Sequence, residues 1–296
     1  MLLSLTLVAP DLDILEEVLP NALEAVAGAG YPVKDMQILG PGALDLLVEG
    51  DDPVILRARA EQAMLHRPVD ICAQLAEGRR KRLLIADMDS TIIGCECLDE
   101  LADFAGIKDQ ISAITERAMR GELDFEPALR ERVAMLKGLP LKALERTYEE
   151  RVRLNPGAQC LARTMALYGA RCVLVSGGFD YFTSRVAEAA GFDAERANRL
   201  LDDGHALSGK VAEPILGREA KLAALREEAA EQGLELFEAV AVGDGANDLA
   251  MIIAAGLGVA YRAKPIVAGQ ADARVDHADL TALLYFQGYG ADEFVY

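Results

Sequence analysis

The chain has 296 residues, and its 48 acidic against 30 basic side chains give a formal net charge of −18. This charge would repel a nucleic-acid backbone and an anionic membrane surface, so neither is an expected partner. Apolar residues make up 52% of the chain, which is enough to fill the cores of two domains.

Residues 1–78 are predicted to form a small N-terminal domain. The expected strands cover residues 2–8, 33–38, 43–48 and 69–75, and the expected helices cover residues 12–27 and 54–65. This strand–helix–strand–strand–helix–strand order is the ferredoxin-like βαββαβ pattern, and the Gly40-Pro41-Gly42 turn supports a central hairpin. No set of residues in this segment indicates catalysis.

A run of four basic residues, Arg79 to Arg82, follows this segment. Such a run could mimic a localisation signal, but we interpret it as a solvated linker in front of the next strand. Residues 79–296 then alternate strands and helices, as in the doubly wound parallel sheet of an α/β domain. Within them, residues from about 95 to 155 are helical in character. They are predicted to form an inserted cap that covers the site at the strand ends described next.

Three apolar runs in this second domain are followed by small, acidic or hydroxyl residues. They are residues 83–86 before Asp87 and Asp89, residues 171–175 before Ser176 and Gly177, and residues 237–242 before Asp244, Asn247 and Asp248. Ligands of open α/β sheets bind beyond the carboxyl ends of the strands, so these three strand ends predict one shared site. Taken alone, the first of them could instead be the N-cap of a helix.

The remaining expected elements complete the α/β domain. They are a helix after Ser176 that runs to residue 190, a hairpin of residues 198–201 and 206–211, helices at 219–231 and 248–255, and a strand at 258–261. The helix at 219–231 carries Lys221 near its start. The longest uncharged apolar stretch, residues 249–261, is too short to span a bilayer.

These residue types indicate phosphoryl transfer. Asp87 is the candidate nucleophile, which would form an aspartyl-phosphate, and Asp89 is placed to protonate the leaving alcohol and then to activate water. Lys221 would face the transferring phosphoryl group, while Ser176 and the Gly177 N–H would cradle it. Lysine in a helix is more often a solvated charge, and Ser-Gly-Gly is ordinarily just a turn.

A site with several carboxylates also needs positive charge. Mg²⁺ is held by few carboxylates and keeps waters and phosphate oxygens as its other ligands. Asp87 and Asp244 are the candidates that would supply those carboxylates to a bound Mg²⁺.

In the order in which they occur, these motifs resemble those of haloacid-dehalogenase-type phosphatases over about residues 80–296. The stretch from Asp87 through Glu96 to Ala102, and the segment from Thr115 to Gly138, further resemble the phosphoserine phosphatases of that superfamily. The resemblance implies hydrolysis of O-phospho-L-serine to L-serine and phosphate, the last step of L-serine biosynthesis.

The resemblance also assigns roles to single residues. Glu96 would meet the substrate ammonium and Arg132 its carboxylate, while Met119 and Phe125 would shape the pocket. Asp89 would add a backbone carbonyl to the Mg²⁺ ligands. Asn247 and Asp248 would support the phosphate, the metal and Lys221.

Other readings of the sequence remain open. The substrate could be another small phosphomonoester, or the domain could be a phospho-accepting signalling domain, which also uses an aspartate, Mg²⁺ and a lysine. The N-terminal segment is similar to ACT-type regulatory domains, so an amino-acid sensor and a homodimer through this segment are further expectations. Five scattered cysteines and the absence of a secretory signal pattern predict a reducing, cytoplasmic location.

Overall fold

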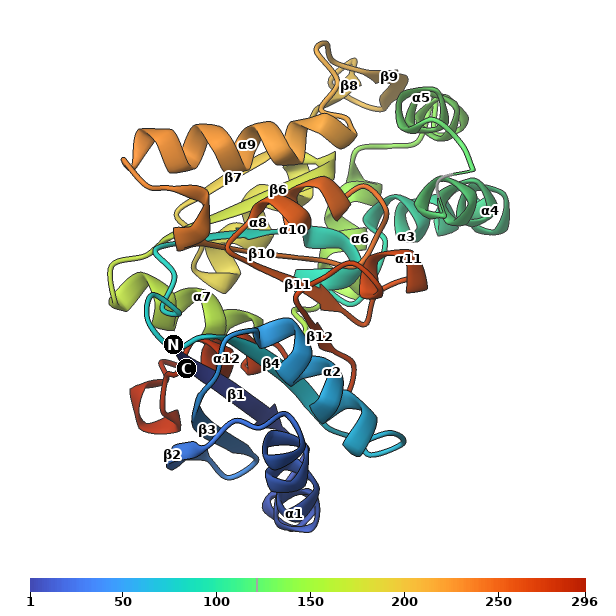
Figure 1. Ribbon diagram of the computed structural model, residues 1–296. Coiled ribbons are helices and arrows are strands. Elements are labelled where there is room, and N and C mark those ends of the chain that lie inside the picture. The colour runs from blue at the N-terminus through green and yellow to red at the C-terminus, as the bar shows by residue number, and fades with distance from the viewer. Residues whose placement is uncertain (121) are drawn as a thin grey trace.

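The computed structural model of the chain describes residues 1–120 and 122–296, and it describes Met119 and Arg218 by their backbone alone. The N-terminal antiparallel sheet lies below the central parallel sheet in Figure 1, and the helices α4 (Lys108–Met119) and α5 (Phe125–Met135) project on the far side of the central sheet. None of the helices in the described ranges is both long and apolar enough to cross a membrane.

The N-terminal sheet has the strand order β2-β3-β1-β4. Its elements are β1 (Leu2–Val8), α1 (Leu12–Gly28), β2 (Val33–Gly40), β3 (Ala43–Glu49), α2 (Pro53–Ala63) and β4 (Asp70–Leu75). Alternate side chains of β1 face opposite sides, so Leu3, Leu5 and Leu7 pack into one core with residues of both helices. The predicted ferredoxin-like order is therefore confirmed.

The opposite face of β1 carries a buried polar network. The carboxylate of Asp45 on β3 accepts hydrogen bonds from the hydroxyls of Ser4 and Thr6, each at 2.7 Å, and pairs with Arg79 at 2.5 Å. Asp45 is fully buried and the Arg79 side chain is 15% exposed. This ion pair contradicts the prediction that residues 79–82 are a solvated linker, because Arg79 turns inward to neutralise a buried acid.

Replacing Asp45 with Ala is expected to lower the free energy of unfolding by about 3–5 kcal/mol, because it leaves a buried guanidinium and two hydroxyls without their acceptor. The control is Glu49→Ala, which breaks the exposed Lys34–Glu49 pair on the same sheet and should cost less than about 1 kcal/mol. Urea denaturation followed by circular dichroism measures both. Equal losses in the two variants would contradict this assignment.

The central sheet is parallel and has the order β12-β11-β10-β5-β6-β7. Its strands are β5 (Leu83–Ala86), β6 (Arg171–Phe179), β7 (Ala194–Asn198), β10 (Ala239–Gly243), β11 (Leu257–Tyr261) and β12 (Ala273–Val275). The three strands predicted to share a site, β10, β5 and β6, are direct neighbours. Their carboxyl ends therefore meet at one edge, and the predicted α/β class is confirmed.

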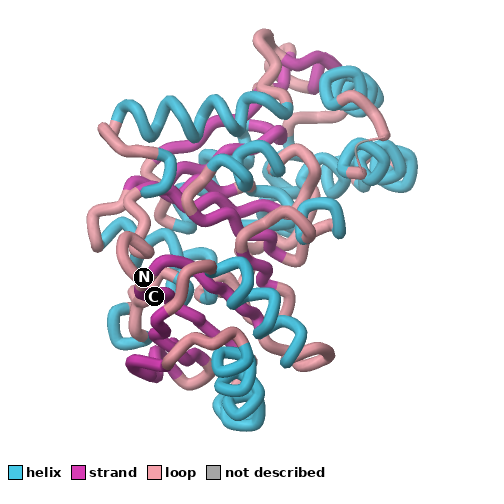
Figure 2. The backbone as a smooth tube through the Cα atoms, viewed as in Figure 1, coloured by secondary structure: helices cyan, strands magenta, loops and turns pink. Residues whose placement is uncertain are grey.

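Helices cover both faces of this sheet (Figure 2). On β5, Leu84 and Ala86 enter one core, whereas Leu83 and Ile85 enter the other. The helices α7 (Ala158–Leu167), α8 (Asp180–Ala190) and α12 (Ala282–Phe286) bury residues in the first core, and α9 (Arg218–Glu231) and α10 (Leu249–Ala254) bury residues in the second. Burial on both faces explains the continuous apolar run that predicted β5.

The segment inserted between β5 and β6 is helical in its described part, as predicted. After the turn η1 (Met88–Ile92) it contains α3 (Cys97–Asp103), α4, α5 and α6 (Lys142–Arg151). A small hairpin, β8 (Leu200–Asp202) and β9 (Leu207–Val211), packs against α5 beside it (Figure 1). The predicted hairpin is therefore confirmed, but its first strand begins at Leu200, because Asn198 ends β7 in the central sheet and Arg199 lies between the two strands.

Two further differences have local causes. Residues 237 and 238 belong to the turn η2 (Leu236–Glu238), because Glu235 and Glu238 exchange capping hydrogen bonds there, so β10 begins at Ala239. The elements α7, β7, α11 (Pro265–Ala268), β12, α12 and η3 (Ala291–Glu293) were not predicted. Apart from α7, which has 10 residues, they are short, with three to five residues each, and so carry little periodicity.

Candidate active site

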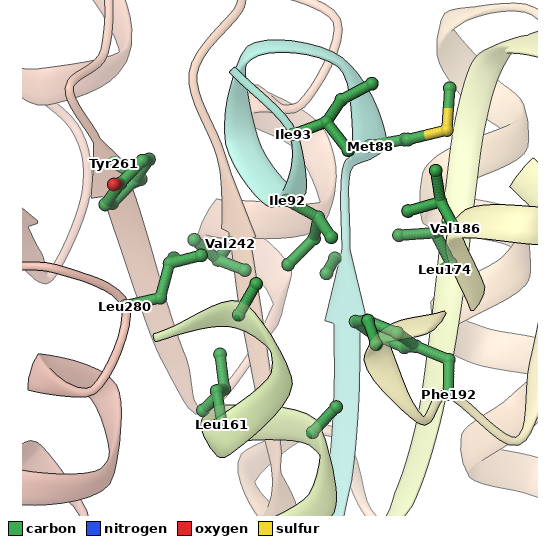
Figure 3. Close-up of a cluster of buried hydrophobic side chains, with 14 of the residues drawn as sticks. Met88, Ile92, Ile93, Leu161, Leu174, Val186, Phe192, Val242, Tyr261 and Leu280 are labelled. Atoms are coloured by element: carbon green, nitrogen blue, oxygen red, sulfur yellow. The ribbon is translucent and has the colours of Figure 1, made fainter. Parts of the chain in front are cut away.

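The loop after β5 holds Asp87 and Asp89 on either side of a buried anchor. Met88 and Ile92 are fully buried, and Figure 3 shows them among Leu174, Val186 and Val242. The Asp87 N–H also donates to the Val242 carbonyl at 3.0 Å, which ties the loop to β10. Because the apolar side chain between them points into the core, both carboxylates are left at the sheet edge.

Lys221 lies between two carboxylates. Its Nζ is 2.5 Å from Asp87 Oδ1 and 2.5 Å from Asp248 Oδ1, and all three side chains are buried. Burial by itself lowers the pKa of Lys221, but the charges of Asp248 and Asp87 outweigh it and hold the pKa above its usual value. The lysine is therefore a fixed positive charge beside Asp87.

The three carboxylates of Asp87, Asp244 and Asp248 each bring an oxygen within 4.8 Å of the others. Asp248 is already committed, because its Oδ1 pairs with Lys221 and its Oδ2 accepts the N–H groups of Asp244 and Gly245. Asp87 and Asp244 keep carboxylate oxygens for another ligand. Burial, followed by repulsion from Asp248, raises the pKa of Asp244 to about 7 and that of Asp87 well above its usual value.

These carboxylates fit a divalent cation. In the described part of the chain, Lys221 pairs with Asp87 and Asp248, and Asp244 has no cation within 4.0 Å. Three clustered carboxylates and one ammonium leave net negative charge in a buried site, and hard cations such as Mg²⁺ prefer such oxygen donors. A bound cation would also reverse the upward pKa shifts of its ligands.

Asp89 lies next to Ser176 at the end of β6. Its Oδ1 accepts the Cys97 N–H at 2.9 Å and its Oδ2 accepts the Ser176 hydroxyl at 3.3 Å. Burial is the largest influence on Asp89 and raises its pKa, although the Cys97 N–H opposes that shift. A carboxyl with a raised pKa can carry the proton that a leaving alcohol requires.

A cavity of about 290 Å³ joins this centre to the helical insertion. Of the predicted site residues, those that line it are Asp87, Asp89, Glu96, Phe125, Arg132, Ser176, Gly177 and Asn247. Lys221, Asp244 and Asp248 lie directly behind Asp87, as the distances above show. Met119 is in α4, but its side chain lies outside the described part of the structure.

The insertion brings two opposite charges to the cavity. Arg132 on α5 is buried, donating from Nη1 to the Thr115 hydroxyl at 2.9 Å and from Nε to the Ala128 carbonyl at 3.1 Å. Glu96 accepts the Ser90 hydroxyl at 2.6 Å. Burial and then the charge of Asp89 raise the pKa of Glu96 to about 8, while burial lowers the pKa of Arg132.

Close packing sets the shape of the cavity where the cap meets the sheet. A Cβ atom on Gly177 would come within 2.8 Å of the Phe125 ring, which is closer than real Cβ contacts allow. Because Gly177 has no side chain, the Phe125 ring on α5 can pack directly against the last part of β6.

Three positioning residues, Asp99, Thr115 and Asn198, received no role from the sequence. Thr115 on α4 donates to Asp99 on α3 at 2.7 Å and accepts from Arg132, so it links three cap helices. The Asn198 side chain donates to the carbonyls of Gly177 and Leu216 and accepts the Leu216 N–H, which ties the last part of β6 to the segment before α9. Asp99 and Thr115 lie in the stretches that resemble phosphoserine phosphatases, but their roles were not assigned, because the partners of all three residues are distant in the sequence.

Comparison with known proteins places this architecture in a family. A family model of haloacid dehalogenase-like hydrolases matches residues 84–252, which run from β5 to α10. The chain belongs to the haloacid dehalogenase-like hydrolases. The matched stretch contains every predicted site residue of this family's motifs in the chain, from Asp87 to Asp248.

Several relatives within the family are phosphoserine phosphatases. The one from Streptococcus thermophilus is 48% identical over 201 residues, covering 68% of this chain and 93% of that protein. The one from Archaeoglobus fulgidus is 44% identical over 205 residues, covering 69% of this chain but only 59% of that longer protein. A solved phospho-aspartyl intermediate analogue of phosphoserine phosphatase has a TM-score of 0.66 and 39% identity, covering 70% of this chain and 99% of that one.

Proposed function

We propose that the chain is a phosphoserine phosphatase that hydrolyses O-phospho-L-serine to L-serine and phosphate, the last step of L-serine biosynthesis. The observation that carries the proposal is that one cavity holds the carboxylates for phosphoryl transfer together with Glu96 and Arg132. A phosphoserine molecule has a phosphate for the carboxylates that carry out phosphoryl transfer. It also has an ammonium for Glu96 and a carboxylate for Arg132. The identity to phosphoserine phosphatases supports the same substrate.

In the proposed mechanism, Asp87 is the nucleophile. Its carboxylate oxygen forms a bond to phosphorus while the bond from phosphorus to the serine oxygen breaks, and Asp89 gives its proton to that oxygen. Asp89 then takes a proton from water, whose oxygen bonds to phosphorus while the bond from phosphorus to the Asp87 oxygen breaks, which releases phosphate and restores the Asp87 carboxylate. Lys221, together with Ser176 and Gly177 in the last part of β6, would face the charge that develops on the phosphoryl oxygens.

We propose Mg²⁺ as the cofactor, held by the carboxylates of Asp87 and Asp244 and the backbone carbonyl of Asp89. When bound, it supplies charge neutralisation that lets an anionic carboxylate approach an anionic phosphate. Asp248 would act indirectly, since it holds Lys221 and the backbone of Asp244. Asn247 lines the cavity and is proposed to contact the phosphate.

The cap would select the substrate. The Arg132 guanidinium suits a carboxylate because the two groups pair through parallel hydrogen bonds. An ionised Glu96 offsets the ammonium, and the ammonium in turn favours that ionised form. Phe125 supports the wall of the pocket, and Met119 is proposed to do so from α4.

The proposal is tested by measuring phosphate release from a matched substrate series with Mg²⁺ and with EDTA. O-phospho-L-serine should turn over, whereas phosphoethanolamine, which lacks the carboxylate, and 3-phosphonooxypropanoate, which lacks the ammonium, should be at least about 100-fold poorer in kcat/KM. EDTA should abolish turnover and added Mg²⁺ should restore it. Equal rates across the series would indicate a broad phosphomonoesterase, and a long-lived phosphoprotein without turnover would indicate a signalling domain.

Replacing Thr115 with Val is expected to raise KM for phosphoserine about tenfold with little change in kcat, because one hydrogen bond that orients the Arg132 guanidinium is lost. Thr115→Ser should restore KM, since it keeps the hydroxyl. The control is Thr147→Val on α6, where the buried hydroxyl donates to the Ala143 carbonyl and does not line the cavity. Steady-state kinetics distinguish the two sites, and a fall in kcat alone would contradict the role given to Thr115.

Three expectations about the wider protein stay predictions. They are a cytoplasmic location, a homodimer formed through the N-terminal domain, and amino-acid binding by that ACT-like domain. Sedimentation of the full chain, and of a variant with Met36→Lys and Ile38→Lys on the exposed edge strand β2, would test the second. Unchanged association in that variant would exclude β2 as the contact.

A further inference from the structure

The basic run between the N-terminal sheet and β5 contains one cation without a carboxylate partner. Arg79 pairs with Asp45 at 2.5 Å, Arg80 with Glu293 at 2.7 Å and Arg82 with Glu238 at 3.2 Å. Lys81 has no carboxylate within 4.0 Å in the part of the chain that the structure describes, although it is the most buried of the four at 7% exposure. The Lys81 ammonium therefore has no directly paired carboxylate, although burial makes an unpaired charge costly.

The Lys81 ammonium is only partly satisfied by the protein. Its Nζ donates to the carbonyls of Gly78 at 3.1 Å and Phe237 at 3.0 Å. An ammonium has three N–H donors, so one remains for another acceptor. Burial lowers the pKa of Lys81 although the charges of Asp272 and Glu238 oppose that shift, and an anion in direct contact would offset more of the cost of burial.

Lys81 lines a cavity of about 270 Å³ between the N-terminal domain and the central sheet. The cavity shares no residue with the catalytic one, and its lining includes the start of α2, the end of β4, Phe237 in η2 and the start of β11. A second cation, Arg57 on α2, lies on the same wall. Its Nη1 donates to the carbonyls of Ala271 and Asp272, and it has no carboxylate within 4.0 Å among the described residues.

The rest of the lining limits the kind of ligand. Apolar side chains that are unusually exposed surround the cavity, with Val54 at 62%, Leu75 at 47% and Phe237 at 61%. The carboxylates of Asp272 and Glu77 also line it, and Asp272 Oδ2 accepts the Gly258 N–H. These two acids disfavour a dianion such as phosphate more than a monoanion, and the apolar rim favours a ligand with an apolar body.

We propose that this cavity binds a small monocarboxylate with an apolar body, whose carboxylate pairs with Lys81 and Arg57. Such a ligand bridges the N-terminal domain, through α2, to the segment that enters β5 and leads to Asp87. It covers Val54, Leu75 and Phe237 and supplies the counter-charge that Lys81 lacks. The site is separate from the proposed catalytic function and does not depend on it.

The test is isothermal titration of the full chain with phenylacetate, with phenethylamine as a probe of the same body and opposite charge. Phenylacetate should bind and phenethylamine should not. Lys81→Met and Arg57→Met should each weaken phenylacetate binding at least tenfold, whereas Arg82→Met, in the same basic run but exposed, should leave it unchanged. Arg132→Ala should also bind phenylacetate normally, which separates this site from the catalytic cavity.

Several results would overturn the proposal. They are no binding of phenylacetate, equal binding of phenethylamine, loss of binding in Arg132→Ala, and full binding in either Lys81→Met or Arg57→Met. Displacement of bound phenylacetate by inorganic phosphate in the Arg132→Ala variant would overturn the monocarboxylate class. If Lys81→Met does not fold, Arg57→Met decides the matter together with phenylacetate-induced amide shifts, which should centre on Ala73 and Gly256 in the wild-type chain.

Discussion

Replacing Asp87 with Asn is expected to reduce kcat for phosphoserine at least about 10⁴-fold, because an amide cannot serve as the nucleophile in place of a carboxylate. The substitution keeps the shape of the side chain, so the loop between β5 and η1 should retain its geometry. It also removes one of three buried carboxylates that crowd within 4.8 Å. The free energy of unfolding should therefore stay the same or rise, which separates lost chemistry from lost folding.

Mass spectrometry of acid-quenched reactions makes this test specific. The wild-type chain should carry a phosphoryl group on Asp87 during turnover, and Asp87→Asn should carry none. In Asp89→Asn, both protonation of the leaving oxygen and activation of water should be impaired. A phosphorylated Asp87→Asn chain, or one with wild-type kcat, would contradict Asp87 as the nucleophile.

The control for these substitutions is Asp193→Asn. Its Oδ2 accepts the Cys172 N–H near the start of β6, at the opposite end of the strand from Ser176. Because the substitution is nearly isosteric and remote from the cavity, kcat should remain within about twofold of the wild-type value.

The acidic and hydroxyl residues of the candidate site were predictable from the sequence because each of them follows a local pattern. An apolar run that is buried on both faces marks a central strand, and the polar residues that follow it mark the sheet edge. Asp87, Ser176 and Asp244 each follow such a run, and β5, β6 and β10 are neighbours. Strand β7 has no such run, because it is an outermost strand of the sheet, its sequence is polar and its side chains are mostly half-buried.

Interactions between distant segments were not predictable in this way. The basic run at residues 79–82 was interpreted as solvated, because composition does not reveal that Asp45 and Glu293 approach it from opposite ends of the chain. The same limit hid the Asp99–Thr115–Arg132 chain of hydrogen bonds, which exists only because α3, α4 and α5 pack together. Arg132 itself was assigned by resemblance, and its exposed neighbour Arg130 is the same residue type on the same helix.

This pair of arginines provides the second large prediction. Arg132→Ala is expected to lower kcat/KM for phosphoserine by about 10²- to 10³-fold, because a buried partner for the substrate carboxylate is removed, a loss of about 3–4 kcal/mol. Turnover of p-nitrophenyl phosphate, which has no carboxylate, should change less than about threefold. Phosphate release is measured with both substrates. The test is decided by how much more the variant loses with phosphoserine than with p-nitrophenyl phosphate.

Arg130→Ala on the same helix is the matched control, since Arg130 is exposed and pairs with Glu126 and Glu213. It should leave both substrates unaffected. Arg132→Lys should restore little, because a lysine can neither pair with a carboxylate through two parallel hydrogen bonds nor reach Thr115 and the Ala128 carbonyl from one planar group. Equal losses with both substrates in Arg132→Ala would mean that Arg132 supports the fold of the cap, and selection of the substrate carboxylate would then have to come from another part of the cavity.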